Sequence, residues 1–183
     1  MRVDHLSPGL NPPDDFHAVV EIPYEGPPVK YEVDKETGAI LVNRLLGTAM
    51  RYPVNYGFVP NTLAEDGDPL DVMILIRVPI MPGAVMRCRP IGMLEMSDEA
   101  GRDVKIAALP VSEVSPLHDD IRSVDDLTGV SLREIRHFFA HYKDLEQDKW
   151  VEVDGWHGAD AARQEILAAI KRARQASTWR NPS

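Results

Sequence analysis

Apolar and polar residues alternate loosely through the first 110 residues, a pattern that predicts short β-strands rather than helices. Strands are expected over six segments: residues 17–22, 29–33, 39–45, 72–78, 84–96 and 104–109. The turn Asp34-Lys35-Glu36-Thr37-Gly38 separates the second segment from the third, so these two should pair as a hairpin. Gly92 lies inside the longest segment, where a glycine marks a bulge of the kind that closes a small barrel. Residues 47–57, which contain Tyr52-Pro53 and Asn55-Tyr56-Gly57, have turn chemistry.

The last third of the chain has the 3.6-residue periodicity of helices. One helix is expected from Ser131 to about Tyr142, because Ser131 and Glu134 have the spacing of a capping box. Its apolar residues share one face: Leu132, Ile135, Phe138, Phe139 and Tyr142.

A short strand over residues 149–153 should precede a closing helix from residue 161 to about residue 176, capped by Asp160. This helix is expected to turn three residues inward: Ile166, Leu167 and Ile170. The basic run from Lys171 to Arg174 looks like a solvated helix end, matching the helix dipole.

Many short strands followed by two helices, without a βαβ rhythm, predict a mixed α+β fold that is mainly β: a β-barrel flanked by two helices. The 183 residues, 44% of them hydrophobic, suffice for one domain with a real core and hardly for two, so we expect a single domain over residues 1–183. Within it, residues 1–14 are expected as an extended arm and residues 177–183 as a tail.

Composition narrows the function classes. No apolar run approaches the length of a membrane span and the N-terminus lacks a signal-peptide pattern, so we expect a soluble, cytoplasmic protein without membrane contact. A formal charge of −9 with scattered Lys and Arg argues against nucleic-acid binding. The single cysteine, Cys88, cannot form an intrachain disulfide and is expected to be buried, without chemistry.

The stretch Glu65-Asp66-Gly67-Asp68-Pro69-Leu70-Asp71 places three aspartates within six positions. In an extended segment Asp66 and Asp68 would face the same side, and Pro69 could bring Asp71 round beside them. Two such charges about 4 Å apart repel by roughly 4 kcal/mol at an effective dielectric near 20. The stretch alone leaves two interpretations open: a solvated acidic turn, or an oxygen-only site for a hard divalent cation.

Carboxylates next to cations recur along the chain, which favours a metal-bridged polyanion over a calcium store. Asp103 is followed two residues later by Lys105 on the same strand face, and Lys30 stands two residues before Glu32. The sequence has none of the common nucleotide, zinc or serine-hydrolase motifs, and the acidic stretch does not fit an EF-hand. His137 and His141, one helical turn apart, are interpreted as packing or subunit-interface residues rather than metal ligands.

Asp66-Gly67-Asp68-Pro69-Leu70-Asp71-Val72 resembles the signature of the family I soluble inorganic pyrophosphatases. Further segments are similar to the bacterial branch of that family: Glu21-Ile22-Pro23, Lys30-Tyr31-Glu32, residues 34–38, Tyr52-Pro53, residues 55–57, Arg87-Cys88-Arg89-Pro90, Asp98-Glu99-Ala100-Gly101 with Asp103, and residues 137–144. The resemblance covers roughly residues 15–175. It implies an OB-like five-stranded barrel flanked by two helices, hydrolysis of inorganic pyrophosphate to two phosphates, Mg²⁺ dependence and a homohexamer.

The resemblance also implies roles for individual residues. Asp68 is similar to the general base that activates a metal-bridged water or hydroxide. Metal ligands are implied at Glu21 (through water), Asp66, Asp71, Asp98 and Asp103. Substrate-binding groups are implied at Lys30, Arg44, Tyr56, Tyr142 and Lys143, with Lys105 and Glu32 in support. Alternatively, Tyr56 and Tyr142 could be core aromatics with wet hydroxyls, and Glu32 an outward ion pair.

Seven of these residues are acidic and four are basic, which leaves the expected site at −3 and repels a bare polyanion. Divalent cations would reverse that sign. Mn²⁺ should substitute for Mg²⁺, whereas Ca²⁺ should bind and inhibit, because its ligand distances are longer and its coordination is looser. Two rival classes are a non-enzymatic Ca²⁺-binding or OB-type nucleic-acid module, and a phosphomonoesterase or nucleotide pyrophosphohydrolase, for which no base or sugar pocket can be named.

Overall fold

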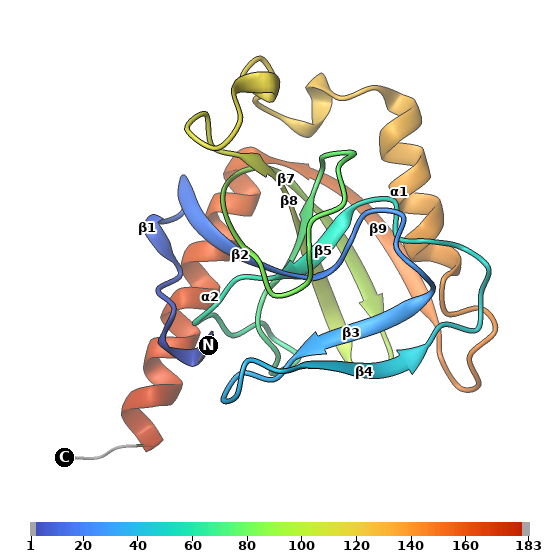
Figure 1. Ribbon diagram of the computed structural model, residues 1–183, viewed down its shortest axis with the longest axis horizontal. Helices are drawn as coiled ribbons and strands as arrows, with labels where there is room; N and C mark the ends of the chain where they lie inside the picture. The colour runs from blue at the N-terminus through green and yellow to red at the C-terminus, as the bar shows by residue number, and fades with distance from the viewer. Residues whose placement is uncertain (1–2, 181–183) are drawn as a thin grey trace.

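The computed structural model describes the backbone of residues 3–180 and the side chains of these residues except Asp4 and residues 177–180. Seven strands form one sheet in the order β1-β2-β5-β6-β8-β7-β9 (Figure 1). Their bounds are β1 Gly9–Asn11, β2 Asp15–Ile22, β5 Asn55–Phe58, β6 Asp71–Ile74, β7 Val85–Asp98, β8 Gly101–Pro110 and β9 Val151–Gly158. Because β2 pairs with both β5 and β7, the strands β2, β5, β6, β8 and β7 form a ring, and the predicted five-stranded OB-like barrel is confirmed.

Two features of the barrel position the site. All strand pairs of the sheet are antiparallel except β6 with β8, which places Asp71 opposite Lys105. The long strand β7 has a register shift between Pro90 and Gly92, which is the bulge predicted at Gly92. A Cβ on Gly92 would lie 2.5 Å from the carbonyl oxygen of His157, so the close approach of β9 requires a glycine here.

The strands β3 (Val29–Val33) and β4 (Ile40–Leu45) form a separate antiparallel hairpin, as predicted, at the lower edge of the barrel in Figure 1. Its turn is held by Asp34, whose Oδ1 accepts a hydrogen bond of 2.7 Å from the backbone N–H of Thr37. Lys30 pairs with Arg44 across the hairpin. This pairing places two basic side chains from neighbouring strands beside each other at the edge of the barrel.

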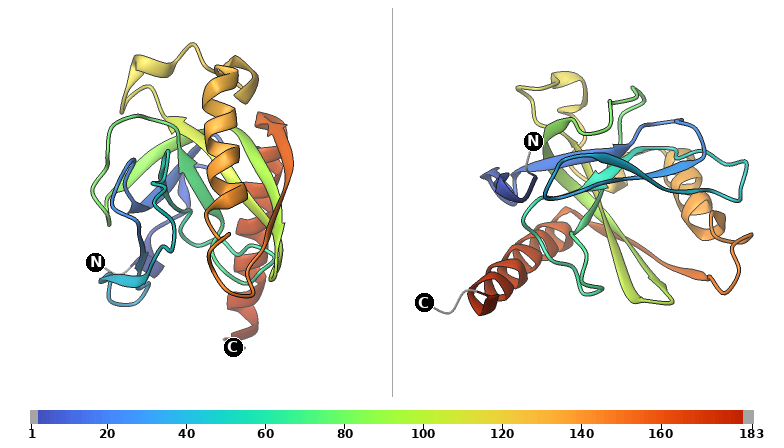
Figure 2. Two further views of the ribbon diagram at one scale, coloured as in Figure 1. Left: turned by 90° about the vertical axis from the view of Figure 1, so that its right-hand side faces the viewer. Right: turned by 60° about the horizontal axis from the view of Figure 1, so that its bottom comes forward.

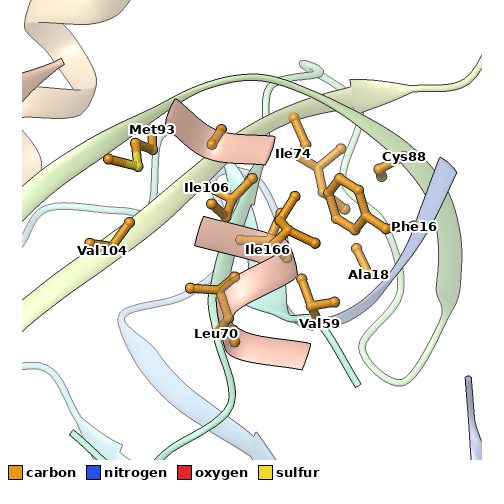
Figure 3. Close-up of a cluster of buried hydrophobic side chains, with 14 of the residues drawn as sticks. Phe16, Ala18, Val59, Leu70, Ile74, Cys88, Met93, Val104, Ile106 and Ile166 are labelled. Atoms are coloured by element: carbon orange, nitrogen blue, oxygen red, sulfur yellow. The ribbon is translucent and has the colours of Figure 1, made fainter. Parts of the chain in front are cut away.

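The two helices, α1 (Gly129–His141) and α2 (Ala159–Arg180), pack on opposite faces of the same strands (Figure 2). Val72 and Ile74 of β6 face a core that contains Ile166 of α2, part of which is shown in Figure 3. Met73, between them, faces a second core that contains Phe139 of α1. The alternation of side chains along β6 and β8 therefore serves two cores, each closed by one helix.

Several predicted helix details are wrong. Helix α1 begins at Gly129, two residues before Ser131, and its N-cap is Thr128 and not Ser131. Thr128 has the extended backbone typical of a cap, and its side chain accepts a hydrogen bond from the Ser131 N–H. Asp160 lies inside the first turn of α2, which begins at Ala159, and therefore does not precede the helix as its cap. Leu167 is half exposed, since only the face of Ile166 and Ile170 meets the core.

The strand predicted over residues 72–78 ends at Ile74, and β5 lies where turns were expected. Both differences involve Asn55, which is fully buried. Its amide Nδ2 donates to the carbonyls of Ile76 (3.3 Å) and Val78 (3.0 Å), and its Oδ1 accepts from the backbone N–H groups of Tyr24 (3.0 Å) and Ile80 (2.8 Å). One side chain thus satisfies the backbone polar groups that a longer strand would have paired.

Elsewhere, the expected extended arm contains a 3₁₀ turn, Val3–His5, and strand β1. Two further 3₁₀ turns, Pro116–His118 and Val124–Asp126, lie in the loop before α1. Strand β9 is longer than the predicted residues 149–153, and the expected tail lies partly in α2 and partly outside the described residues. Cys88 is buried, as predicted. Within residues 3–180, no helix is long and apolar enough to span a membrane.

Candidate active site

A cavity of about 400 Å³ opens where the β3–β4 hairpin, the β5–β6 loop, the β7–β8 turn and the end of α1 meet. Every site residue predicted from the sequence lines it: Glu21, Lys30, Glu32, Arg44, Tyr56, Asp66, Asp68, Asp71, Asp98, Asp103, Lys105, Tyr142 and Lys143. The fold therefore brings together groups from seven strands, a loop and a helix end, separated by up to 122 positions from Glu21 to Lys143.

Lys105 lies at the floor of the cavity and its side chain is only 2% exposed. Its ammonium donates to Asp71 Oδ2 at 2.8 Å, to Asp103 Oδ1 at 2.9 Å and to the Tyr56 hydroxyl oxygen at 2.9 Å. The Tyr56 hydroxyl in turn donates to Asp71. Burial by itself would lower the pKa of Lys105, but Asp71, Tyr56 and Asp103 outweigh it and hold the pKa well above its usual value. The lysine is a fixed positive charge between two carboxylates.

The acidic stretch forms a tight loop between β5 and β6. Asp66 Oδ1 accepts a hydrogen bond of 3.0 Å from the Asp68 N–H, and Gly67 adopts φ +94°, a conformation that favours glycine. The Ala64 N–H donates to the Asp68 carbonyl at 2.7 Å, which closes the loop on itself. The side chain of Asp68 is 80% exposed at the loop tip and lies 4.0 Å from the ammonium of Lys35.

Glu21, on β2, has a strongly perturbed carboxyl group in the cavity. Burial, with help from the nearby charge of Asp71, raises its pKa to about 7, although a hydrogen bond of 2.8 Å from the Val33 N–H opposes both effects. A proton on Glu21 would therefore be exchanged near neutral pH.

The basic residues of the cavity rim are each paired with an acid. Glu32, which is 43% exposed, forms an ion pair of 3.1 Å with Lys30, and both residues line the cavity, so the two interpretations of Glu32 are not exclusive. Lys143 lies 2.7 Å from Asp98. Arg44 Nε lies 3.2 Å from Glu146, a residue that the sequence gave no reason to select.

Tyr56 and Tyr142 are both core aromatics and cavity residues, so the two interpretations of the sequence are not exclusive. They are 7% and 8% exposed, and Tyr142 stacks on Phe138 with ring centroids 5.4 Å apart. Burial raises the pKa of both hydroxyl groups. Each therefore stays a neutral hydrogen-bond donor at the edge of the cavity.

The sequence interpretation missed three charged cavity residues: Lys35, Glu99 and Lys149. Lys149 donates to Glu99 at 2.5 Å. Burial alone would raise the pKa of Glu99, but hydrogen bonding to Lys149 and the charge of Lys143 lower it to about 2. Lys35 and Glu99 stand inside motifs that were identified, whereas Lys149 was assigned only to a strand. With these three, eight acids face six bases, and the lining has a net charge of −2 instead of the expected −3.

The donor chemistry fits a hard divalent cation, because the acids of the cavity offer carboxylate oxygens only. Asp71 and Asp103 share one ammonium and so lie close enough to share a cation. Among the side chains that the structure describes, no three His, Cys, Asp or Glu residues converge on one point. The Lys105 ammonium lies between Asp71 and Asp103, whereas Asp66 and Asp68 reach the same cavity from the β5–β6 loop. The acids are therefore separated by cavity space.

Comparison with known proteins gives consistent results. The family described as "Inorganic pyrophosphatase" matches residues 18–174. The chain is 53% identical to an inorganic pyrophosphatase of Aquifex pyrophilus over 93% of its length and 96% of the relative's, and 49% identical to that of Escherichia coli K12 over 95% and 99%. The crystal structure of the inorganic pyrophosphatase from Thermus thermophilus is similar with a TM-score of 0.89, at 41% identity, covering 95% of this chain and 99% of that one.

Proposed function

Since this chain belongs to the inorganic pyrophosphatase family, in its bacterial form, and hydrolyses pyrophosphate, we propose that it does so with Mg²⁺ bound by the cavity acids and with Asp68 as general base. The observation that supports this most is the cavity of about 400 Å³, which is lined by eight acidic and six basic residues. Acids alone would repel pyrophosphate and bases alone would not hold a cation, so the mixture suits a cation-bound polyanion.

We assign the metal ligands to Glu21, Asp66, Asp71, Asp98 and Asp103. When bound, Mg²⁺ supplies positive charge to the phosphoryl oxygens and lowers the pKa of a bound water. Mn²⁺ is the proposed substitute, because it shares the preference of Mg²⁺ for six oxygen ligands.

The basic and phenolic groups of the rim hold the substrate in this proposal. Lys30, Arg44 and Lys143 donate to phosphoryl oxygens, and the ion pairs they make with acids keep them oriented before the substrate arrives. Tyr142 supplies a neutral donor, whereas Tyr56, whose hydroxyl proton is donated to Asp71, lines the substrate cavity beside that aspartate. Lys105, whose donors are directed to Tyr56, Asp71 and Asp103, contributes charge and holds the two aspartates close to each other.

Asp68 is suited to proton transfer because its exposed carboxylate can reach a water in the cavity mouth. The water oxygen attacks one phosphorus atom, its proton passes to Asp68, and the bond from that phosphorus to the bridging oxygen breaks. The leaving phosphate takes the electron pair and is stabilised by the rim cations.

We further propose a cytoplasmic homohexamer without nucleic-acid or membrane partners. The net charge of −9 argues against nucleic acids, and the resemblance to bacterial relatives suggests the assembly. His137 and His141, whose rings lie 4.6 Å apart on the exposed side of α1, are candidates for a subunit contact.

A phosphate-release assay on pyrophosphate, ATP and a simple phosphomonoester, with Mg²⁺ and with excess EDTA, tests the metal and the substrate together. We expect hydrolysis of pyrophosphate in Mg²⁺ and none in EDTA. Full activity in EDTA would contradict the proposed metal dependence, and equal rates on the phosphomonoester would favour the rival phosphatase function.

A further inference from the structure

The basic run from Lys171 to Arg174 near the end of α2 was expected to be exposed to solvent, but Arg172 is partly buried. Arg172 is 29% exposed and its guanidinium points at the barrel and not at solvent. Its Nε donates to the carbonyl of Leu63 at 2.8 Å, and its Nη2 donates to Glu165 at 2.6 Å. Glu165 stands two helical turns before Arg172, so both lie on the same face of α2.

Leu63 begins the loop that carries Asp66 and Asp68, and α2 holds both of its backbone polar groups. Its carbonyl accepts from Arg172, and its N–H donates to the carbonyl of Ala169 at 3.0 Å. Ala169 is fully buried and lies between Glu165 and Arg172 on the helix, where its small side chain lets the loop backbone approach. At its other end the loop is held by the Leu70 N–H, which donates to the buried Thr62 hydroxyl at 2.9 Å.

A second arginine extends this contact to the strand that carries Asp103. Arg102 donates to Glu165 at 3.0 Å and to Glu65 at 3.2 Å. Arg102 immediately precedes Asp103 on β8, and Glu65 immediately precedes Asp66 in the loop. Because successive side chains of a strand point to opposite faces, Asp103 faces the cavity while Arg102 faces α2.

Glu165 is the centre of the arrangement, with a side chain that is only 11% exposed. Burial alone would raise its pKa, but the hydrogen bonds from Arg172 and Arg102 outweigh burial and lower it. The carboxylate is therefore charged at neutral pH and accepts from both arginines at once.

We propose that Arg172 and Glu165 are positioning residues for the hydrolysis: they clamp the loop through Leu63 and, with Arg102, fix Asp66 relative to Asp103. None of the three lines the cavity, so they act through the loop and not on substrate. The inference rests on the proposed role of Asp66 as an Mg²⁺ ligand. A loop released from α2 would have to be ordered each time the cation binds, which weakens cation affinity.

The test compares Arg172→Met, Arg172→Lys and Glu165→Gln with Arg163→Met. Arg163 lies on the same helix and makes ion pairs of 2.7 Å with Asp14 and 3.0 Å with Asp160, far from the loop, so its loss controls for charge and helix stability. Two quantities are measured: amide hydrogen exchange of residues 64–68 in the metal-free protein, and the Mg²⁺ concentration that gives half-maximal pyrophosphate hydrolysis.

In Arg172→Met and Glu165→Gln we expect exchange of residues 64–68 about 10-fold faster, without a matching change in the barrel strands. We expect the half-maximal Mg²⁺ concentration to rise about 10-fold, with turnover at saturating Mg²⁺ nearly restored. Arg172→Lys, which keeps the charge but has a single nitrogen in place of Nε and Nη2, should recover part of both effects, and Arg163→Met should show neither. A purely structural role would lower the melting temperature and leave the Mg²⁺ requirement unchanged.

Exchange and Mg²⁺ requirement both within about twofold of the wild type would overturn the proposal, since outer partners of a metal site are expected to matter more than that. Faster exchange with an unchanged Mg²⁺ requirement would also overturn it. Asp66→Asn, measured alongside, distinguishes a failure of the clamp from a failure of the proposed metal site. If Asp66→Asn raises the Mg²⁺ requirement while Arg172→Met does not, Asp66 remains the proposed ligand and only the clamp is refuted.

Discussion

Replacing Lys105 by Met should destabilise the metal-free protein strongly and the Mg²⁺-loaded protein much less. The methionine keeps most of the buried stem but removes the ammonium that lies within 3 Å of Asp71 and Asp103. At an effective dielectric near 20, each of these contacts is a gross attraction of roughly 6 kcal/mol, much of which is offset by the desolvation of a side chain that is 2% exposed. Removing one partner leaves two carboxylates facing each other, for which the usual loss is about 3–5 kcal/mol.

The assay is urea unfolding in EDTA and again in saturating Mg²⁺. In EDTA we expect the free energy of unfolding to fall by about 3–5 kcal/mol, and in Mg²⁺ we expect at least half of that loss to disappear, because divalent cations neutralise the same acids. Lys149→Met is the matched control: Lys149 pairs with Glu99 but is 37% exposed, so its loss should cost about 1 kcal/mol or less. A loss below about 1 kcal/mol for Lys105→Met in EDTA, or one that Mg²⁺ does not reduce, would refute this account of the site.

Four further predictions follow from the same geometry. Asp68→Asn should slow turnover by about 10²-fold or more at unchanged Mg²⁺ affinity, whereas Asp66→Asn should raise the Mg²⁺ concentration needed for activity. An Mg²⁺ titration in which Asp68→Asn raises this concentration and Asp66→Asn does not would reverse the two roles. Burial raises the pKa of Glu21 to about 7 from an ordinary value of 4.5, which gives stability that is present at acid pH and lost as pH rises through 7. In EDTA the free energy of unfolding should therefore fall by roughly 2.5 kcal/mol between pH 5 and 8 in the wild type and not in Glu21→Gln, and an equal pH dependence of urea unfolding in the two proteins would contradict this. Replacing both His137 and His141 by Ala should weaken the proposed homohexamer, because their neighbouring rings form the proposed subunit contact; an unchanged sedimentation mass of the double variant, or a monomeric wild type, would count against that contact. Ca²⁺ added at fixed Mg²⁺ should occupy the acids and stop phosphate release, because its longer ligand distances misplace the attacking water; full turnover with Ca²⁺ alone would mean that the cation does not set the geometry of attack.

The parts of the fold that depend on neighbouring residues could be predicted from the sequence. The β3–β4 hairpin was expected because its strands alternate and its turn carries Asp34 and Gly38, whose roles are local. Most residues of the cavity could be selected because the short motifs in which they stand resemble those of a known family, whereas spacing alone indicated only pairs such as Asp103 and Lys105, which share one strand face. The roles of these residues stay predictions.

Contacts between distant segments could not be predicted. Nothing local indicates that the buried Asn55 would hold four backbone groups of other segments, two of which lie where the predicted strand would have continued beyond Ile74. Arg172 lies in a basic run that is typical of an exposed helix end, and only the approach of Leu63, 109 positions earlier, gives it a buried partner. Lys149 reaches the cavity for the same reason, through a loop whose path periodicity does not determine.

The ring of strands sets the order in which the chain can complete its fold during synthesis. Strand β2 is made early, but its edge is closed only by β7, where Phe16 pairs with Cys88 and Val19 with Val85. At ribosomal speeds, roughly 3 to 13 s separate the synthesis of Ile22 from that of Val85, and β2 exposes a hydrogen-bonding edge for all of that time. The hydrophobic core that contains Phe16 and Ala18 of β2 can be completed only later, because it also contains Ile166 of α2. The nascent chain should therefore be a client of chaperones until α2 has left the ribosome, although in the finished barrel β7 pairs with residues 16–19 of this edge.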